Sequence, residues 1–292
     1  VYTSKTTDLL MAQSIPTLPG YARAYANVGK TKNFGYDLTF NFVPVRTKDF
    51  EWNIGVNAAY SRNEIVSLAN GKEDDPANGW FIGESTNSIY TYESAGLWKE
   101  EDRADMEKFN ANGHDFQIGM ARPVDQNGDY KIDANNDRTI VGHYDPRWTL
   151  GLNTNFTYKG WDLGIQLYGR MGFKYYDSSV WVGGRYNVRD YDYYNENNKN
   201  AAHPKPIYDE GGKDAYYNET YLKNGSYLKI RNISLGYTFP NRLLTHTGLS
   251  ALRMYAQIKN PGYIFSGCKT LDLDTYSNTY NSGFTFGLNL SF

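Results

Sequence analysis

The C-terminal segment of the chain alternates strictly between two kinds of residue, and this pattern constrains the fold more than any other feature. One set of positions is apolar: Phe284, Phe286, Leu288, Leu290 and Phe292. The intervening set is small or polar: Gly283, Thr285, Gly287, Asn289 and Ser291. A period of two is typical of a β-strand whose faces meet different environments. A tilted strand needs ~9–11 residues to cross a bilayer, so this apolar face is long enough to do so. A soluble sandwich can also end on such a strand.

The same alternation recurs along the chain and predicts eight strands, all antiparallel. Seven are clear, and residues 1–10 are a weaker candidate. The clear strands are expected at 33–43, 52–61, 148–158, 161–172, 227–239, 250–260 and 281–292. In each, a polar face opposes the apolar one, as a water-filled lumen requires. The predicted fold class is therefore all-β, an up-and-down transmembrane β-barrel portion.

The connections between these strands are alternately short and long. Short turns are expected at 44–49, 159–160 and 240–249, and long loops at 61–147, 173–226 and 261–281. Bacterial barrels have short periplasmic turns and long external loops, which orients the chain. This parity leaves no place in the wall for the strand-like segment 88–98. We therefore expect it in an external loop, followed by a short surface helix over 99–108.

Composition agrees with a barrel and excludes several other classes. No run of 18 apolar residues suits a transmembrane helix, yet the chain has 27 Tyr, 14 Phe and 6 Trp. Aromatic residues populate the girdles at both membrane interfaces of a barrel. A net charge of −2 with no basic stripe argues against nucleic-acid binding. Cys268 is the single cysteine, and the four His are scattered with no nucleophile motif or zinc spacing, so we expect no enzyme.

The end of the chain resembles the C-terminal strand of outer-membrane β-barrels. Their assembly machinery recognises a pattern with a polar residue, a glycine, an apolar residue and a terminal aromatic residue. Thr285, Gly287, Leu290 and Phe292 occupy those positions. The resemblance therefore implies that Gly287, Leu290 and Phe292 form an assembly signal.

Several further segments, in order along the chain, resemble SusC/RagA-like TonB-dependent outer-membrane transporters. They are Thr6–Leu10, Asn27–Gly29, Gly96–Trp98, Asp125–Asp129, Asp145–Trp148, Tyr158–Leu163, Ser226–Ile233 and Leu235–Pro240. The chain departs from the family at Asn260-Pro261-Gly262, where Asn-Leu-Phe is usual.

The resemblance implies the C-terminal part, residues 1–292, of a larger plugged barrel with long external loops. We expect the plug domain to lie outside this chain. It further implies a bacterial outer-membrane location, a SusD-like surface lipoprotein as partner, and import of an oligosaccharide or peptide. The TonB energy-coupling complex would act through the missing plug. Two alternatives stay open: a soluble glycan-binding β-sandwich, and a small self-closed barrel that acts as an adhesin or structural protein.

One external segment has the spacing of a calcium-binding loop. Asp125, Asn127, Asp129 and Asp133 occupy positions 1, 3, 5 and 9, and oxygen ligands suit a hard cation. Position 6 is not Gly, position 12 is not Glu, and the next carboxylate, Asp137, comes one residue late. The alternative is a turn in which these side chains accept hydrogen bonds from their own backbone. A structural Ca²⁺ is the one cofactor that the sequence suggests.

A second external cluster is aromatic and lies within the loop at 173–226. It comprises Trp181, Tyr186, Tyr191, Tyr193 and Tyr194. Rings with polar tips suit stacking on sugars or on a protein partner. Packing of the loop against itself or the barrel rim is the alternative.

Overall fold

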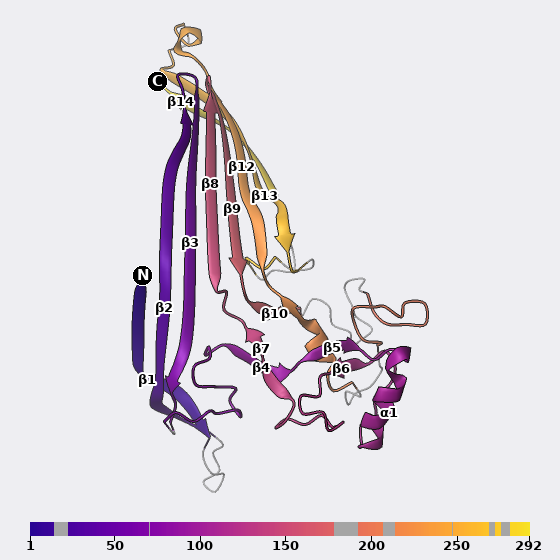
Figure 1. The fold of residues 1–292 in the computed structure, drawn as a ribbon. Helices are drawn as coiled ribbons and strands as arrows, with labels where there is room; N and C mark the ends of the chain where they lie inside the picture. Colours follow the sequence, from indigo (N-terminus) through magenta and orange to yellow (C-terminus); the bar gives the residue numbers. More distant parts are fainter. Residues whose placement is uncertain are drawn as a thin grey trace.

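The computed structural model describes residues 1–14, 23–69, 71–177, 192–206, 214–246, 248–268, 272–275 and 281–292. Most of the chain forms one antiparallel sheet of eight strands in the order β1-β2-β3-β8-β9-β12-β13-β14. Its strands are β1 (Tyr2–Ser14), β2 (Arg23–Arg46), β3 (Phe50–Ser67), β8 (Trp148–Tyr158), β9 (Trp161–Met171), β12 (Tyr227–Thr238), β13 (Ala251–Ser266) and β14 (Gly283–Ser291). The tall strands stand side by side, with the short strands and helix α1 gathered at one end (Figure 1). No helix in the described part of the chain is long and apolar enough to span a membrane.

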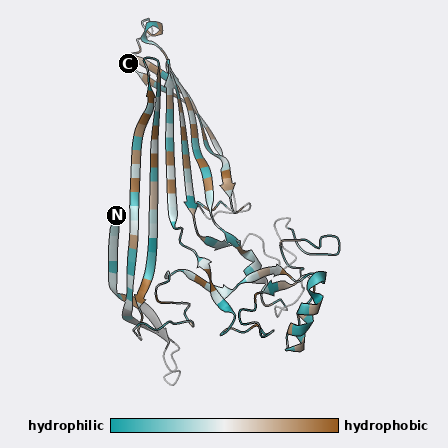
Figure 2. Cartoon of the chain, viewed as in Figure 1, coloured by the Kyte–Doolittle hydropathy of each residue, from teal (hydrophilic) through white to brown (hydrophobic). Residues whose placement is uncertain are grey.

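Strand pairing places the apolar residues of β2, β3, β8, β9, β12, β13 and β14 largely on one face of the sheet. One row crosses the sheet through Phe42, Ile54, Thr154, Ile165, Ile233, Ile258 and Phe284. The neighbouring row runs through Trp52, Phe156, Leu163, Leu235, Ala256 and Phe286. The alternation appears as brown and teal bands along the tall strands other than β1 in Figure 2. Phe40 is 59% exposed and Phe286 81% exposed, so this face is an uncovered apolar surface of the kind that contacts lipid.

Aromatic side chains gather at both ends of the apolar face. At the loop end, Tyr36, Tyr60 and Trp148 contact one another with ring centroids 5.1 to 5.6 Å apart. At the turn end, Trp161 contacts Tyr237 at 4.8 Å, and Tyr158 lies opposite Trp161 in the pairing. Ten residues separate Trp148 from Tyr158 on β8, about 34 Å of strand. A tilt of ~40° reduces this to ~26 Å, which matches the ~25 Å apolar band of outer-membrane barrels.

The turn end of the sheet is compact. Lys159 and Gly160 both have positive φ, at 45° and 91°, as a two-residue hairpin with a type I′ turn requires. A side chain on Gly160 would also collide with the carbonyl oxygen of Thr238. The turn after β12 carries the short helix η3 (Asn241–Leu243). Three turns at this end and long connections at the other confirm the alternation that the sequence predicts.

Four strands extend further than their hydropathy pattern indicates. β2 begins at residue 23 instead of 33, β3 runs to Ser67, β1 runs to Ser14, and β13 runs to Ser266. Beyond the aromatic girdle these strands lie in water, so backbone pairing continues without alternation. The long loops therefore start later than residues 61 and 261. At the turn end, β2 ends at Arg46 and β3 begins at Phe50, so the turn expected at 44–49 is confined to 47–49. Pro261 is accommodated in β13 because the register shifts there and Asn260 has φ of 48°, which marks a bulge.

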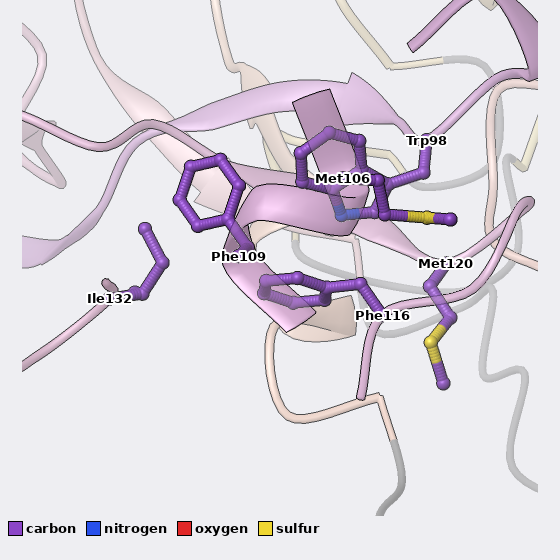
Figure 3. Close-up of a cluster of buried hydrophobic side chains, with 6 residues drawn as sticks. All are labelled: Trp98, Met106, Phe109, Phe116, Met120 and Ile132. Carbon is purple, nitrogen blue, oxygen red and sulfur yellow. The ribbon is translucent and has the colours of Figure 1, made fainter. Parts of the chain in front are cut away.

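The first long loop folds into a packed external unit. β4 (Ser88–Tyr92) pairs with β7 (Arg138–His143), and β5 (Ser94–Leu97) pairs with β6 (Ala121–Pro123). This confirms that segment 88–98 is not a wall strand. The predicted helix appears as η1 (Glu100–Asp102) followed by α1 (Arg103–Ala111), and it ends three residues later than expected. Its buried side chains join a core in Figure 3 that comprises Trp98, Met106, Phe109, Phe116, Met120 and Ile132.

The second long loop contributes smaller elements beside this unit. β10 (Lys174–Tyr176) pairs with β11 (Leu222–Asn224), and η2 (Tyr217–Tyr221) precedes β11. The backbone N–H of Ala121 in β6 donates to the carboxylate of Asp214 at 2.9 Å. The two long loops therefore form one external layer above the sheet.

The architecture does not support the two alternatives raised by the sequence. In the described part of the chain no second sheet packs on the apolar face, as a soluble sandwich would need. Within the same residues β1 and β14 are the two edges of the sheet and do not pair with each other, so the sheet is not a closed small barrel.

Candidate functional site

The face opposite the apolar one is polar and forms the candidate functional surface, the luminal face. Near the turn end, its charged groups are paired across the sheet. Arg253 of β13 contacts Asp162 of β9 at 2.5 Å, and the pair passes over Gly236 of the intervening β12. The residues above it are mostly amides and hydroxyls, such as Asn153, Gln166, Asn232, Ser234 and Gln257.

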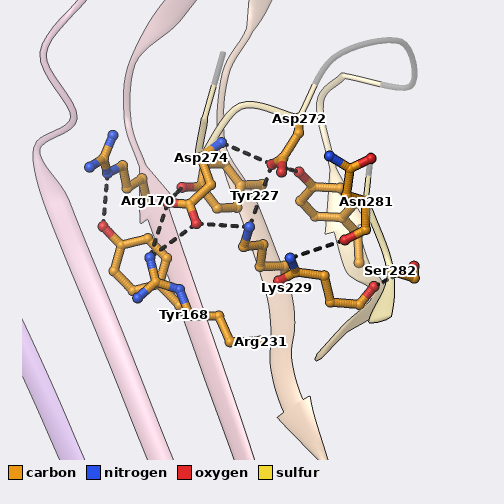
Figure 4. Close-up of polar contacts among 11 residues, drawn as sticks. Tyr168, Arg170, Tyr227, Lys229, Arg231, Asp272, Asp274, Asn281 and Ser282 are labelled. Atoms are coloured by element: carbon orange, nitrogen blue, oxygen red, sulfur yellow. Dashed lines mark hydrogen bonds and ion pairs between the residues drawn. The ribbon is translucent and has the colours of Figure 1, made fainter. Parts of the chain in front are cut away.

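Further toward the loop end, the luminal face carries a network of charges and tyrosines (Figure 4). Lys229 of β12 is 1% exposed, and its ammonium lies 2.8 Å from Asp274 and 3.5 Å from Asp272. Tyr263 donates a hydrogen bond of 2.6 Å to Asp272, and Tyr227 donates one of 3.3 Å to Asp274. A buried ammonium is tolerated only when it is paired and hydrogen-bonded in this way.

The two carboxylates belong to the connection between β13 and β14, whose described residues 272–275 we call the strap. Leu273 of the strap is fully buried in a cluster with Phe173, Tyr175, Tyr227 and Cys268. The strap therefore folds back over the luminal face, held by one apolar side chain between two acidic ones.

The strap reaches below the outer aromatic girdle. Tyr168 lies opposite Lys229 in the pairing of β9 with β12, and it is three residues from Met171, which pairs with Trp148 of the girdle. Three residues of a strand tilted by ~40° correspond to ~8 Å of depth. The charged network thus lies inside the membrane-spanning part of the wall, on the side away from lipid.

Aspartate side chains in the predicted calcium loop accept hydrogen bonds mainly from backbone N–H groups. Asp125 accepts from Gly128 at 2.7 Å and from Tyr130 at 2.8 Å, and Tyr130 adopts the positive φ that a glycine would favour. Asp133 accepts from the backbone of Asn135 and Asn136 at 2.8 and 2.9 Å. This is the bonding of an Asx-rich turn.

The remaining members of that loop are bonded similarly. The side chain of Asn127 accepts a hydrogen bond from the backbone N–H of Asp129. The carboxylate of Asp129 in turn accepts one from the backbone N–H of Lys131 at 2.8 Å. Asp137 is fully buried and accepts from Gln126 at 2.9 Å and Asp133 at 2.7 Å. Among the described residues no three His, Cys, Asp or Glu side chains are grouped to hold a metal ion. Calcium binding stays a prediction.

The aromatic loop residues are only partly within the described structure. Trp181, Tyr186 and Tyr191 lie outside the described residues. Tyr193 is 37% exposed, whereas the ring of Tyr194 lies against Gly119 of the external unit. Tyr194 therefore packs the two long loops together, and ligand binding by the group stays a prediction.

The predicted assembly signal has a clear geometry. Leu290 and Phe292 continue the apolar face, with Phe292 90% exposed at the end of the sheet. Gly287 lies on the luminal side, where the ring of Tyr255 lies across it so closely that a Cβ would overlap the ring. Packing thus accounts for the glycine, and recognition of the signal by an assembly machinery stays a prediction.

The external unit contains a buried carboxyl group that sequence reasoning did not single out. Glu219 of η2 accepts a hydrogen bond of 2.5 Å from Thr91, and its Oε2 is buried without a hydrogen-bond partner among the described residues. Burial therefore raises the pKa of Glu219, against the smaller opposing effects of Thr91 and Arg138. No local motif marks it, because its partners come from other loops.

Sequence reasoning also missed the luminal network and the role of Asp145. Asp145 accepts from Asn63 at 2.9 Å, Ser85 at 3.1 Å and Asn87 at 2.9 Å, so it ties the external unit to the start of β8. The Asp145–Trp148 motif was the available signal, but nothing in its spacing shows its partners.

Comparisons with known proteins agree with this architecture. No protein-family model matches the chain. It is 27% identical over its whole length to TonB-dependent receptor P3 of Formosa agariphila and 28% identical over 99% of its length to TonB-dependent receptor SusC of Bacteroides thetaiotaomicron. Among solved structures it is similar to the RagAB peptide transporter, with a TM-score of 0.72 and 25% identity over 99% of the chain.

The fold and these similarities show that the sheet is part of the wall of an outer-membrane β-barrel. More narrowly, the chain is similar to a barrel portion of TonB-dependent receptors, SusC among them, and to the RagAB peptide transporter. It spans about a third of the length of the relatives it matches, 32% of receptor P3 and 29% of SusC.

Proposed function

We propose that this chain forms part of the wall of an importer that brings glycans or peptides across the outer membrane. The observation that carries the proposal is the two-faced sheet, which has an apolar face of bilayer thickness between aromatic girdles and a polar luminal face opposite. SusC and the RagAB peptide transporter, to which the chain is similar, support an import role. The chain itself would provide no catalysis.

The partners follow from the same similarity. A SusD-like surface lipoprotein would contact the external layer formed by the two long loops. The TonB energy-coupling complex would act through a plug domain, which we place outside residues 1–292, so that these residues are the C-terminal part of the barrel. The barrel assembly machinery would recognise Gly287, Leu290 and Phe292.

A deletion experiment tests the import role. The gene for the natural protein would be removed from its host, and growth would be measured on a panel of single glycans and on peptides as the only nutrient source. We expect growth to be lost on one class of nutrient and restored by the intact gene. Unchanged growth and unchanged uptake across both classes would contradict the proposal.

Two variants show whether a loss of import is due to a lower amount of protein in the outer membrane. A substitution that disrupts the external core, Trp98→Asp, would be compared with a substitution on the outer surface of α1, Glu107→Gln. Trp98 is fully buried and Glu107 is exposed, so only the first is expected to disturb the external layer. Import should fail for Trp98→Asp while the protein still reaches the outer membrane.

A further inference from the structure

The luminal network contains more positive than negative charge. Arg170 of β9 and Lys229 and Arg231 of β12 supply three cations, and the carboxylates that contact them in the described structure are Asp272 and Asp274 of the strap. Lys229 lies between both carboxylates, and Arg231 shares Asp274 at 3.0 Å. The strap therefore neutralises two of the three charges.

Two features of the wall bring both guanidinium groups to the side chain of Tyr168. The pairing of β12 shifts register on both sides between Ile230 and Asn232, so Arg231 is the extra residue of a β-bulge. Bulges re-aim side chains and are frequent beside functional sites. The Arg231 guanidinium lies 3.7 Å from the centre of the Tyr168 ring, and the Nε of Arg170 donates to the hydroxyl of Tyr168 at 2.9 Å.

Both guanidinium groups retain donors for a further ligand. Arg170 uses only Nε in bonds to described residues, which leaves its two Nη groups. Arg231 uses one Nη toward Asp274, and its side chain is 44% exposed. Lys229, in contrast, is buried and satisfied, so it holds the strap and has no free donor surface.

From this arrangement we propose that Arg170 and Arg231, on either side of Tyr168, bind a carboxylate group of a molecule in the lumen. Guanidinium forks match the planar geometry of carboxylates, and one further negative charge would balance the network. The position, ~8 Å inside the outer girdle, lies on the route that the proposed import function requires. The inference deepens that function by naming an acidic sugar or a peptide C-terminus as the recognised group.

Binding to the purified natural protein, measured by calorimetry in detergent, tests the inference. The acidic probes are trigalacturonate and N-acetyl-trialanine, and their neutral counterparts are maltotriose and N-acetyl-trialanine amide. We expect at least one acidic probe to bind more tightly than its counterpart, and the probe that binds distinguishes the sugar from the peptide source. Arg170→Gln should weaken that binding about tenfold or more, as expected for loss of a charged hydrogen bond.

Lys259→Gln is the matched control, because Lys259 is an exposed luminal cation of β13 that pairs opposite Asn232 outside the network. It should leave the affinity within twofold. Equal affinity for acidic and neutral probes, or equal effects of the two substitutions, would overturn the inference. The growth experiment tests import separately, so binding without import would reject the proposed function and leave the carboxylate site standing.

Discussion

Phe286 offers the most direct test of the two-faced wall. Phe286 pairs with Ala256 and continues the apolar row through Leu235, whereas its neighbour Thr285 pairs with Gln257 on the luminal side. Six residues separate Phe286 from Phe292, about 20 Å of strand. A tilt of ~40° reduces this to ~15 Å, which is close to the middle of a hydrocarbon core of ~30 Å.

An arginine at that depth on the lipid side costs ~2–4 kcal/mol. This corresponds to about a 30- to 700-fold drop in the ratio of folded to unfolded protein, at ~1.4 kcal/mol for each factor of ten. Phe286→Arg should therefore lower the urea midpoint for folding of the natural protein into lipid vesicles. Thr285→Arg should change it little because the lumen is wet, and Phe286→Leu controls for loss of the ring. Equal shifts for both arginine variants would refute the assignment of faces.

Four other outcomes are expected. Asp274→Asn should loosen the strap, since it leaves a buried lysine with a weakened partner, and so speed labelling of the buried Cys268 by a maleimide, which the unchanged protein should resist. Burial raises the pKa of Glu219, so its protonated form stabilises the fold at low pH, and this stabilisation is lost as pH rises through the raised pKa. Glu219→Gln should therefore raise the melting temperature of the external layer at pH 7 and make that temperature depend less on pH. Asp137→Ala should speed proteolysis of its loop, since two backbone N–H groups lose their acceptor at ~1–3 kcal/mol each, and the same cleavage caused by a chelator alone would establish calcium. Phe292→Ala should lower the amount of folded protein in the outer membrane, and wild-type levels would count against the assembly signal.

Much of the wall was predictable because its determinant is local. Each strand places alternate residues on opposite faces, so period-two hydropathy revealed seven strands clearly, residues 1–10 more weakly, and both surfaces. β8 matches its prediction residue for residue, since its whole length lies between the two girdles. β2 was predicted to begin ten residues too late, because its first part is paired but outside the apolar band.

The candidate binding surface was much less predictable. The calcium prediction drew on spacing within thirteen residues, and the structure shows those side chains bonded largely to their own loop. The aromatic prediction drew on composition, and Tyr194 instead packs against Gly119 from another loop. Both predictions stay untested, and in both cases the local pattern did not reveal the contacts that the residues make.

The sequence by itself determined the fold class, the order of the strands, the apolar and polar faces and the end of the sheet that carries the loops. These follow from backbone geometry and from nearest neighbours along the chain. Only the tertiary structure decided that the strap returns to the luminal face, because Lys229 and Asp272 lie 43 residues apart and no periodicity links them. It also decided the bulge that aims Arg231 toward Tyr168, since a register shift depends on both neighbouring strands at once.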